Sequence, residues 1–232
     1  MIWALQDRSY GLGNFINITP ALKSLSEVTG EPVPVYFEID YVRQCFIDCP
    51  FITILDKQPY DRPAITSGWV DVRNHVPDYI FAYRELSKVF DLNPEAPHTY
   101  VDIPTYEEYP KADAMRLFLY GSGNEDKYYM SKKTPSKASY QKYFRDKFDT
   151  FTGSETDFNR TDWFSHMVTH LGDIRHSLAL IRDSYLIIAN DTGLAHAAGA
   201  MNKDIIILWR NSWLPKNSNP GKNTIIKMCH ES

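Results

Sequence analysis

Residues 187–198, with the sequence IIANDTGLAHAA, decide the fold because they join the end of a strand to the start of a helix. Residues 185–189 form an unbroken apolar run, which is typical of a strand buried on both faces of a parallel sheet. A second apolar run, 205–209, follows an alanine-rich segment, 195–201, that we predict to be helical. Strand, helix and strand in this order predict a βαβ unit.

The turn between this strand and this helix is a candidate phosphate site. Backbone N–H groups at a helix start point beyond the carboxyl end of the preceding strand, where the helix dipole also favours an anion. Gly193 lets phosphate oxygens approach the backbone, Thr192 adds a hydroxyl donor, and His196 follows one turn later. The same spacing also fits a simpler interpretation, in which Asp191 is an ordinary N-cap and His196 an ordinary surface histidine.

The chain before this unit continues the alternation of strands and helices. Apolar runs predict strands at residues 115–120 and 150–152, and helical spacing predicts helices at 136–148, 163–170 and 177–182. The sequence Gly-Ser-Gly at 121–123 directly follows the first of these strands and suits a phosphate, a ribose or an ordinary turn. Residues 127–147 carry seven Lys or Arg and one Asp, which fits either a phosphate partner or a solvated helix face.

The first half of the chain shows the same pattern on a smaller scale. We expect strands at 2–5, 33–37 and 51–55, and helices at 41–49 and 77–90. A further helix runs from about Ile18 to Val28, with Pro20 near its start, where a missing N–H costs least. Residues 100–103 could form an edge strand within an acidic, proline-rich linker at 91–113. We therefore predict two doubly wound α/β domains, 1–105 and 106–232, facing one cleft.

Composition narrows the class of protein. The 232 residues carry 25 Lys or Arg and 29 Asp or Glu, a net charge of −4, which argues against a surface built wholly for nucleic acid. The apolar run at the N-terminus meets Asp7 and Arg8 too early for a signal peptide, and no run is long enough for a membrane helix. Cys45 and Cys49 have the spacing of a metal pair but lack further ligands nearby, so we expect idle thiols. These features predict a cytoplasmic protein.

Several motifs in order resemble glycosyltransferase family nine, the bacterial heptosyltransferases that transfer heptose from ADP-heptose to the lipopolysaccharide core. Residues 178–198 are similar to the family's strand–Asn-Asp-Thr-Gly–helix run, and residues 11–22 to its N-terminal acceptor-side loop and helix. Residues 120–123 with 131–135 resemble its phosphate-contacting loop and lysine, and residues 152–155 its Gly-x-x-Glu turn. The C-terminal resemblance covers about 114–212, whereas the N-terminal one is short.

The resemblance implies two Rossmann-like domains of the GT-B type, with the N-terminal, acceptor-side domain reduced. It also implies inversion at the anomeric carbon with no required metal and no cofactor beyond a nucleoside-diphosphate sugar. Carried over by position, the donor-binding residues are Ser122, Gly123, Lys132, Asp191, Thr192, Gly193 and His196. The acceptor-side loop is represented by Gly11, Gly13 and Asn17.

The catalytic base is the main departure from the family. Asn14 stands where family members carry the Asp that is the candidate base, and Asn17 stands where His is common; an amide cannot accept the proton at neutral pH. Either another carboxylate serves, Asp7 before Asp40, or the acceptor needs little activation, or the protein binds a nucleotide-sugar without catalysis. We keep Asp7, Asn14 and Asp40 as catalytic candidates.

Two hypotheses remain for the identity of the acceptor. The family suggests a glycan or a lipid-linked saccharide. A hydroxymethylated base in bacteriophage DNA would instead use the basic stretch 127–147 for the DNA backbone and the N-terminal half for an extruded base. An NAD-dependent dehydrogenase is disfavoured because Gly11-Leu12-Gly13 lacks the third glycine of a dinucleotide fingerprint.

Overall fold

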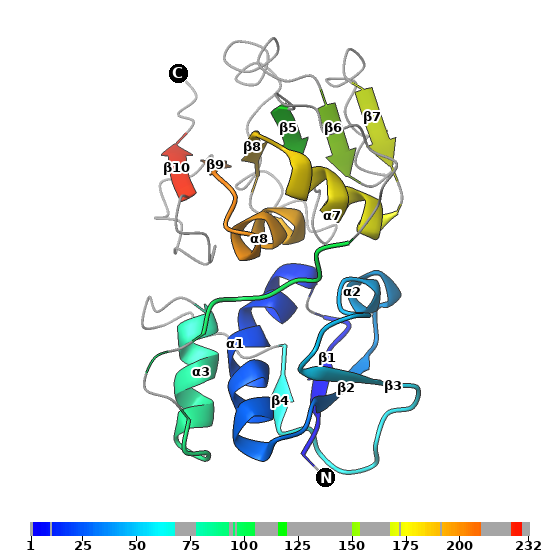
Figure 1. The fold of residues 1–232 in the computed structure, drawn as a ribbon, viewed down its shortest axis with the longest axis vertical. Coiled ribbons are helices and arrows are strands. Elements are labelled where there is room, and N and C mark those ends of the chain that lie inside the picture. The colour runs from blue at the N-terminus through cyan, green and yellow to red at the C-terminus, as the bar shows by residue number, and fades with distance from the viewer. Residues whose placement is uncertain are drawn as a thin grey trace. The chain divides into compact units, whose positions relative to one another are not determined.

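The computed structural model describes residues 2–9, 11–67, 78–92, 95, 97–104, 116–119, 150–153, 168–171, 173–190, 192–209 and 224–228. Two compact units make up the chain, and the division along the sequence falls between Asp102 and Ile103 (Figure 1). Each is an α/β unit with a parallel sheet. In the described residues, no helix is long and apolar enough to cross a membrane.

The N-terminal unit contains a four-stranded sheet in the order β3-β2-β1-β4, with every pair parallel. The strands are short and apolar: β1 (Ala4–Gln6), β2 (Val33–Phe37), β3 (Ile52–Leu55) and β4 (Ile65–Thr66). The helices are α1 (Leu12–Thr29), α2 (Asp40–Gln44) and α3 (Asp78–Ser87). Helices α1 and α3 lie side by side (Figure 1). The two-residue strand β4 was not predicted, because so short a run has no pattern of its own.

Helix α1 begins earlier than its hydrophobic periodicity indicated. It starts at Leu12, so residues 12–14, which precede the helix predicted from about Ile18, form its first turn. It ends at Gly30, whose φ of 73° is the left-handed conformation that glycine adopts without strain, and the Gly30 N–H donates to the Ser26 carbonyl at 2.9 Å. Leu12, Gly13 and Phe15 are buried, so the packed part of the helix includes its first turn.

Pro20 therefore lies in the middle of α1, and the prediction that it sits near the start is wrong. A proline there has no N–H for the Ile16 carbonyl. The Thr19 hydroxyl takes over this role and donates to the Ile16 carbonyl at 2.7 Å. The same hydroxyl oxygen accepts from the Tyr100 N–H at 2.8 Å. One buried threonine thus satisfies the carbonyl that Pro20 leaves and holds the segment that ends this unit.

That segment, residues 97–104, contains no strand, so the edge strand considered for 100–103 does not form. Its N–H groups bond to the Thr19 side chain and, from Asp102, to the Cys45 carbonyl at 3.1 Å, rather than to a neighbouring strand. The buried Asp102 carboxylate accepts from the Asp48 N–H at 2.6 Å and from the Tyr100 hydroxyl at 2.9 Å. Burial, together with this bond to Asp102, raises the pKa of Tyr100.

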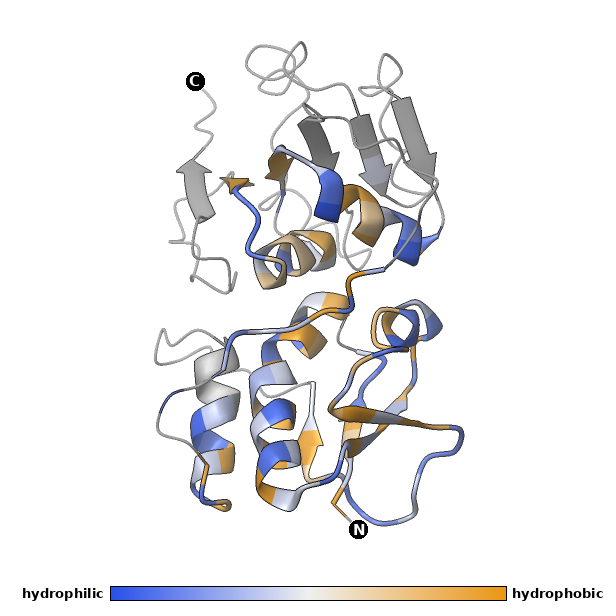
Figure 2. Ribbon diagram, viewed as in Figure 1, coloured by the Kyte–Doolittle hydropathy of each residue, from blue (hydrophilic) through white to orange (hydrophobic). Residues whose placement is uncertain are grey.

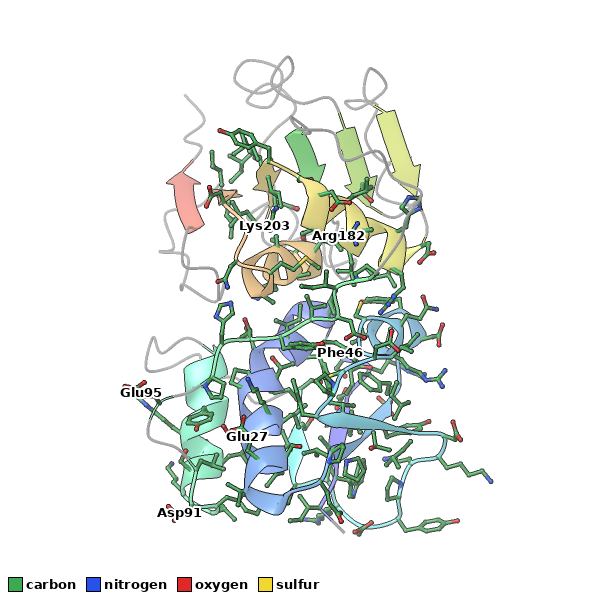
Figure 3. All side chains as sticks on the ribbon, in the orientation of Figure 1. Glu27, Phe46, Asp91, Glu95, Arg182 and Lys203 are labelled. Atoms are coloured by element: carbon green, nitrogen blue, oxygen red, sulfur yellow. The ribbon has the colours of Figure 1, made fainter. Side chains whose placement is uncertain are left out.

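Aromatic packing forms the centre of the N-terminal core. The Phe15 ring lies 4.8 Å from both the Phe37 and the Phe46 rings, which joins α1 to β2 and to the turn after α2. Figure 3 labels Phe46, which is fully buried, and also Glu27 and Asp91, which are exposed on the outside of the unit. Each buried aromatic ring removes a large apolar area from water, so this cluster stabilises the contact of α1 with the sheet.

The C-terminal unit contains a six-stranded parallel sheet in the order β10-β9-β8-β5-β6-β7. Its strands are β5 (Arg116–Leu119), β6 (Thr150–Gly153), β7 (Val168–Leu171), β8 (Leu186–Ala189), β9 (Ile205–Trp209) and β10 (Thr224–Met228). With β5 as the first strand, this is the doubly wound order of dinucleotide-binding domains. The helix predicted for 163–170 is wrong at its end, because Val168 and Thr169 are β-branched and pair with β6 in parallel register. Strand β10 was not predicted.

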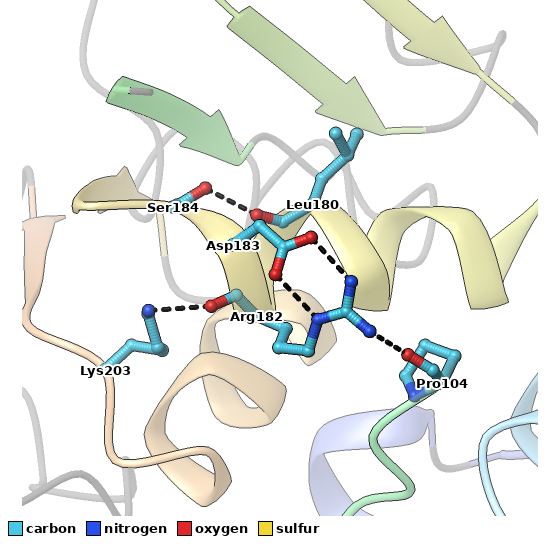
Figure 4. A network of polar contacts seen from close by, with 6 residues as sticks. All are labelled: Pro104, Leu180, Arg182, Asp183, Ser184 and Lys203. Atoms are coloured by element: carbon cyan, nitrogen blue, oxygen red, sulfur yellow. Dashed lines mark hydrogen bonds and ion pairs between the residues drawn. The ribbon is translucent and has the colours of Figure 1, made fainter. Parts of the chain in front are cut away.

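Helices α7 (Ile174–Asp183) and α8 (Gly193–Ala200) lie next to each other in this unit (Figure 1). Figure 2 shows α8 mostly in hydrophobic colours, in agreement with the burial of residues 195–199. A polar network holds the end of α7 (Figure 4): the Lys203 ammonium donates to the Arg182 carbonyl at 2.9 Å, and the Arg182 guanidinium bonds to Asp183 and to the Pro104 carbonyl. Because the last carbonyls of a helix lack helical partners, these contacts stabilise the turn that leads into β8.

Removing the Thr19 hydroxyl is predicted to destabilise the protein strongly. Thr19→Val deletes one buried and one part-buried hydrogen bond and leaves the Ile16 carbonyl and the Tyr100 N–H unpaired, which costs about 2–3 kcal/mol of unfolding free energy. The measurement is urea denaturation followed by far-UV circular dichroism. Thr29→Val is the matched control at the exposed end of the same helix, where we expect a loss below about 1 kcal/mol. Equal losses for the two variants would contradict the role given to Thr19.

Candidate functional site

The sheet of the C-terminal unit has one topological switch point. From β5 the chain goes outward through β6 and β7, and it then returns to the other side of β5 as β8. In open α/β sheets, ligands bind beyond the carboxyl ends of the strands at such a point. The register pairs Leu119 with Ala189, so β5 and β8 end level with each other. The residues that follow these two strands are therefore the candidate ligand contacts of this unit.

The turn after β8 opens α8 as the sequence predicted. Thr192 is the N-cap residue, and its hydroxyl oxygen accepts from the Ala195 N–H at 3.4 Å. Gly193 is the first helical residue, and the first turn of α8 contains no acidic side chain. The interpretation with Asp191 as the N-cap is thus wrong, because Thr192 occupies that position. The hydroxyl hydrogen of Thr192 can be donated to a ligand while its oxygen caps the helix.

His196 lies one turn into α8 and is buried, with 7% of its surface exposed. Its backbone N–H donates to the Thr192 carbonyl at 3.2 Å. The interpretation of His196 as an ordinary surface histidine is therefore wrong. Thr192, Gly193 and His196 come together on the first turns of one helix. Ser122, Gly123, Lys132 and Asp191, and the basic stretch 127–147, lie outside the described residues.

The N-terminal sheet has a switch point of the same kind between β1 and β4. Its order, β3-β2-β1-β4, places these two strands side by side, with connections that go to opposite sides of β1. Asp7 directly follows β1 and Ser67 directly follows β4. The Asp7 N–H donates to the Ser67 hydroxyl oxygen at 3.0 Å, and the Asp7 carboxylate accepts from the Ser9 N–H at 2.7 Å. Asp7, the first-choice base, thus stands at the switch point of its own sheet.

A second carboxylate, not proposed as a site residue from the sequence, contacts the turn that carries Asp7. Glu38 directly follows β2, and its carboxylate accepts from the Arg8 N–H at 2.6 Å. Consecutive residues of the turn, Arg8 and Ser9, therefore donate to two different carboxylates. The signal that could have found Glu38 is its position as the first polar residue after a predicted strand. Ser67 has no such signal, because the strand that it follows was not predicted from the sequence.

The other acceptor-side predictions fall on the first turns of α1. Gly11 is the N-cap residue of α1 and has no side chain to cap it. A Cβ at Gly11 would lie 3.5 Å from the Tyr41 hydroxyl. Gly13 is buried and Asn14 is half-buried. Asn17 is 2% exposed, and its Oδ1 atom has no hydrogen-bond partner within the part of the chain that the structure describes.

Tyr41 lies beside the start of α1. Burial of the hydroxyl and the neighbouring Cys45 raise the pKa of Tyr41, whereas a hydrogen bond with the Leu12 backbone lowers it. Asp40, the second-choice base, is the first residue of α2, and its exposed carboxylate accepts from Gln44 Nε2 at 2.7 Å and lies 3.8 Å from Arg43. The two candidate bases therefore have different partners: Asp40 contacts residues of its own helix, whereas Asp7 contacts Ser9 and Ser67.

Cys45 and Cys49 are both buried. Cys45 Sγ donates to the Tyr41 carbonyl at 3.3 Å, and burial raises the pKa of Cys49 to about 12. Within the described ranges, no group of three or more His, Cys, Asp or Glu side chains is arranged to hold a metal ion.

Comparison with known proteins identifies the fold. No protein-family model matches the chain. No curated protein matches it in sequence. Among solved structures, a glycosyl transferase family 9 protein from Veillonella parvula DSM 2008 matches 97% of this chain and 85% of its own, with 13% identity and a TM-score of 0.70.

Two E. coli enzymes match similarly. Heptosyltransferase WaaC with ADP matches over 100% of this chain and 94% of its own, with 11% identity and a TM-score of 0.68. ADP-heptose lps heptosyltransferase II matches over 97% and 89%, with 11% identity and a TM-score of 0.66. The chain thus has the fold of the family 9 heptosyltransferases over nearly its whole length.

The two buried thiols are predicted to resist alkylation in the folded protein. The thiolate is the reactive form, and both the raised pKa of Cys49 and the burial of both side chains oppose it. At pH 8, iodoacetamide should label Cys45 and Cys49 at least about 100-fold more slowly in the native protein than in urea. Peptide mass spectrometry over a time course measures both rates. Comparable rates in the two conditions would contradict the buried placement.

Proposed function

We propose that the protein is an inverting glycosyltransferase, which transfers a sugar from a nucleoside-diphosphate sugar to an acceptor hydroxyl. The observation that carries this proposal is the start of α8, capped by Thr192, at the switch point between β5 and β8. The likeness to heptosyltransferase folds over nearly the whole chain supports it. The identity of the acceptor, a glycan or a base in DNA, stays a prediction.

The donor's diphosphate would bind at the start of α8. The first turn of α8 contains no acidic side chain, so the Gly193 N–H can face an anion there, and the helix dipole adds positive potential. The Thr192 hydroxyl would donate a further hydrogen bond. WaaC, one of the similar structures, contains ADP, which supports a nucleoside diphosphate as part of the ligand. By the resemblance, Lys132, Ser122, Gly123 and Asp191 would complete the site, and His196 would line it.

The reaction requires a base for the acceptor and stabilisation of the leaving group. The acceptor oxygen attacks the anomeric carbon as the bond from that carbon to the diphosphate oxygen breaks, and the bonding electrons leave with the nucleoside diphosphate. The acceptor proton passes to the base, which we assign to Asp7 because Asn14 has no basic atom at neutral pH. Helix N–H groups and the Thr192 hydroxyl would stabilise the charge that develops on the diphosphate.

Nucleotide binding tests the donor site. Isothermal titration with ADP, UDP and GDP should detect binding of at least one of them. Thr192→Val should weaken that binding about 10-fold or more, because a hydrogen bond to a charged group is lost, whereas Thr192→Ser should stay within about threefold. If none of the three nucleotides binds, the proposal is wrong. Unchanged affinity in Thr192→Val would move the diphosphate away from α8.

Asn14 favours a second candidate function, a nucleotide-sugar-binding protein without catalysis. The two candidates differ in turnover of the donor. If the transferase proposal is correct, the wild type releases nucleoside diphosphate from UDP-glucose, GDP-mannose or ADP-heptose, to an acceptor or slowly to water.

Asp7→Ala should lower that release at least about 100-fold without changing the affinity for the nucleotide, because a general base is lost. Asp40→Ala, measured in parallel, decides between the two carboxylates. Glu27→Ala, on the exposed face of α1, serves as the surface control. Binding of nucleotide without release of product from any of the three donors would favour the second candidate.

A further inference from the structure

The Asp7 backbone is held on both sides by side chains of two other residues. Ser67 holds the N–H of Asp7 through its hydroxyl oxygen. Gln6 holds the carbonyl of Asp7, because Gln6 Nε2 donates to that oxygen at 2.7 Å. Both peptide groups that flank the Asp7 Cα atom are thereby fixed, so the direction in which the carboxylate leaves the chain is fixed as well.

Ser67 acts at the point where two strands separate. The ladder between β1 and β4 continues to the Ser67 N–H, which donates to the Leu5 carbonyl at 3.0 Å. The next N–H, that of Asp7, would in a longer ladder reach a backbone carbonyl, but it reaches the Ser67 side chain instead. Ser67 is 1% exposed. The Ser67 hydroxyl thus makes the last hydrogen bond between the two strands, and the chain after β4 can then turn away from β1.

Gln6 acts on the other side of β1. It is fully buried, and its Oε1 atom accepts from the Ile39 N–H at 2.9 Å. Its backbone carbonyl accepts from the Glu38 N–H at 3.2 Å. Gln6 therefore ties the turn that carries Asp7 to the connection that carries Glu38. Burying a side-chain amide costs free energy unless its oxygen and its nitrogen both form hydrogen bonds. The geometry of Gln6 is therefore tightly determined.

We propose that Ser67 and Gln6 are positioning residues, which hold the Asp7 carboxylate in the orientation needed to take the acceptor proton. This inference rests on the proposed transferase function. A base that is misplaced by about 1 Å loses about 100-fold in rate, because proton transfer and attack must occur in one geometry. Because Ser67 and Gln6 act through Asp7, their loss should change the rate of the chemical step and not the affinity for the donor.

The test is a double-mutant cycle on donor hydrolysis, in which water takes the place of the acceptor. The probe is whichever of UDP-glucose, GDP-mannose and ADP-heptose the wild type hydrolyses fastest. Ser67→Ala should lower kcat about 10- to 100-fold, with KM and the affinity for the free nucleotide unchanged within about twofold. Ser24→Ala is the matched control, since Ser24 is a buried serine of the same unit whose hydroxyl donates to Tyr83 at 3.2 Å. It should keep kcat within about twofold.

The cycle separates positioning from a general effect on the fold. In an Asp7→Asn background, Ser67→Ala should cause no further loss, because the group that it positions is already gone. Gln6→Met provides the same comparison from the other side of Asp7, and it replaces Ser67→Ala in the cycle if that variant does not fold. Losses that are equally large with and without the Asp7 carboxylate would overturn the inference and leave the transferase proposal intact. A wild type that hydrolyses none of the three donors would instead remove the transferase proposal, and this inference with it.

Discussion

The organisation of both units depends on one constraint, the place where neighbouring parallel strands send their connections to opposite sides of the sheet. At that place the strand ends are not covered by a crossover between them, and their last backbone groups need other partners. In the N-terminal unit, the Ser67 hydroxyl supplies the partner for the Asp7 N–H. In the C-terminal unit, Thr192 caps the helix that follows β8. Polar residues lie at these positions because the last backbone groups of the strands need hydrogen-bond partners. The same polar residues are then available to bind a ligand.

A side chain also replaces a missing backbone hydrogen bond inside α1. Pro20 interrupts the helical hydrogen bonds, and the Thr19 hydroxyl both replaces the missing donor and accepts from Tyr100. The segment 97–104 is therefore held by the part of α1 that Pro20 interrupts, and not by a neighbouring strand. Asp102 adds a second anchor through the Asp48 N–H and the Tyr100 hydroxyl. Buried polar networks of this kind specify one arrangement, because each unpaired member would be costly.

The sequence predicted the parts of the fold whose signal is local. Unbroken apolar runs identified β8 and β9, and the Thr-Gly pair after the first of them identified the start of α8. The resemblance to family nine of the glycosyltransferases agrees with the structural matches. The errors arose where long-range pairing outweighs local pattern. Val168–Leu171 has apolar neighbours at helical spacing but pairs with β6, and the two residues of β4 become a strand only through β1. Ser67 and Gln6 could not be found from the sequence, because their importance lies in partners that only the fold brings together.

The central claim is that a diphosphate binds at the start of α8. A crystal structure of the protein with ADP tests it most directly. The claim predicts phosphate oxygens within hydrogen-bonding distance of the Gly193 N–H and the Thr192 hydroxyl, with the nucleoside beyond the ends of β5 and β8. Phosphates bound elsewhere, with the first turn of α8 closed off by packed side chains, would contradict it.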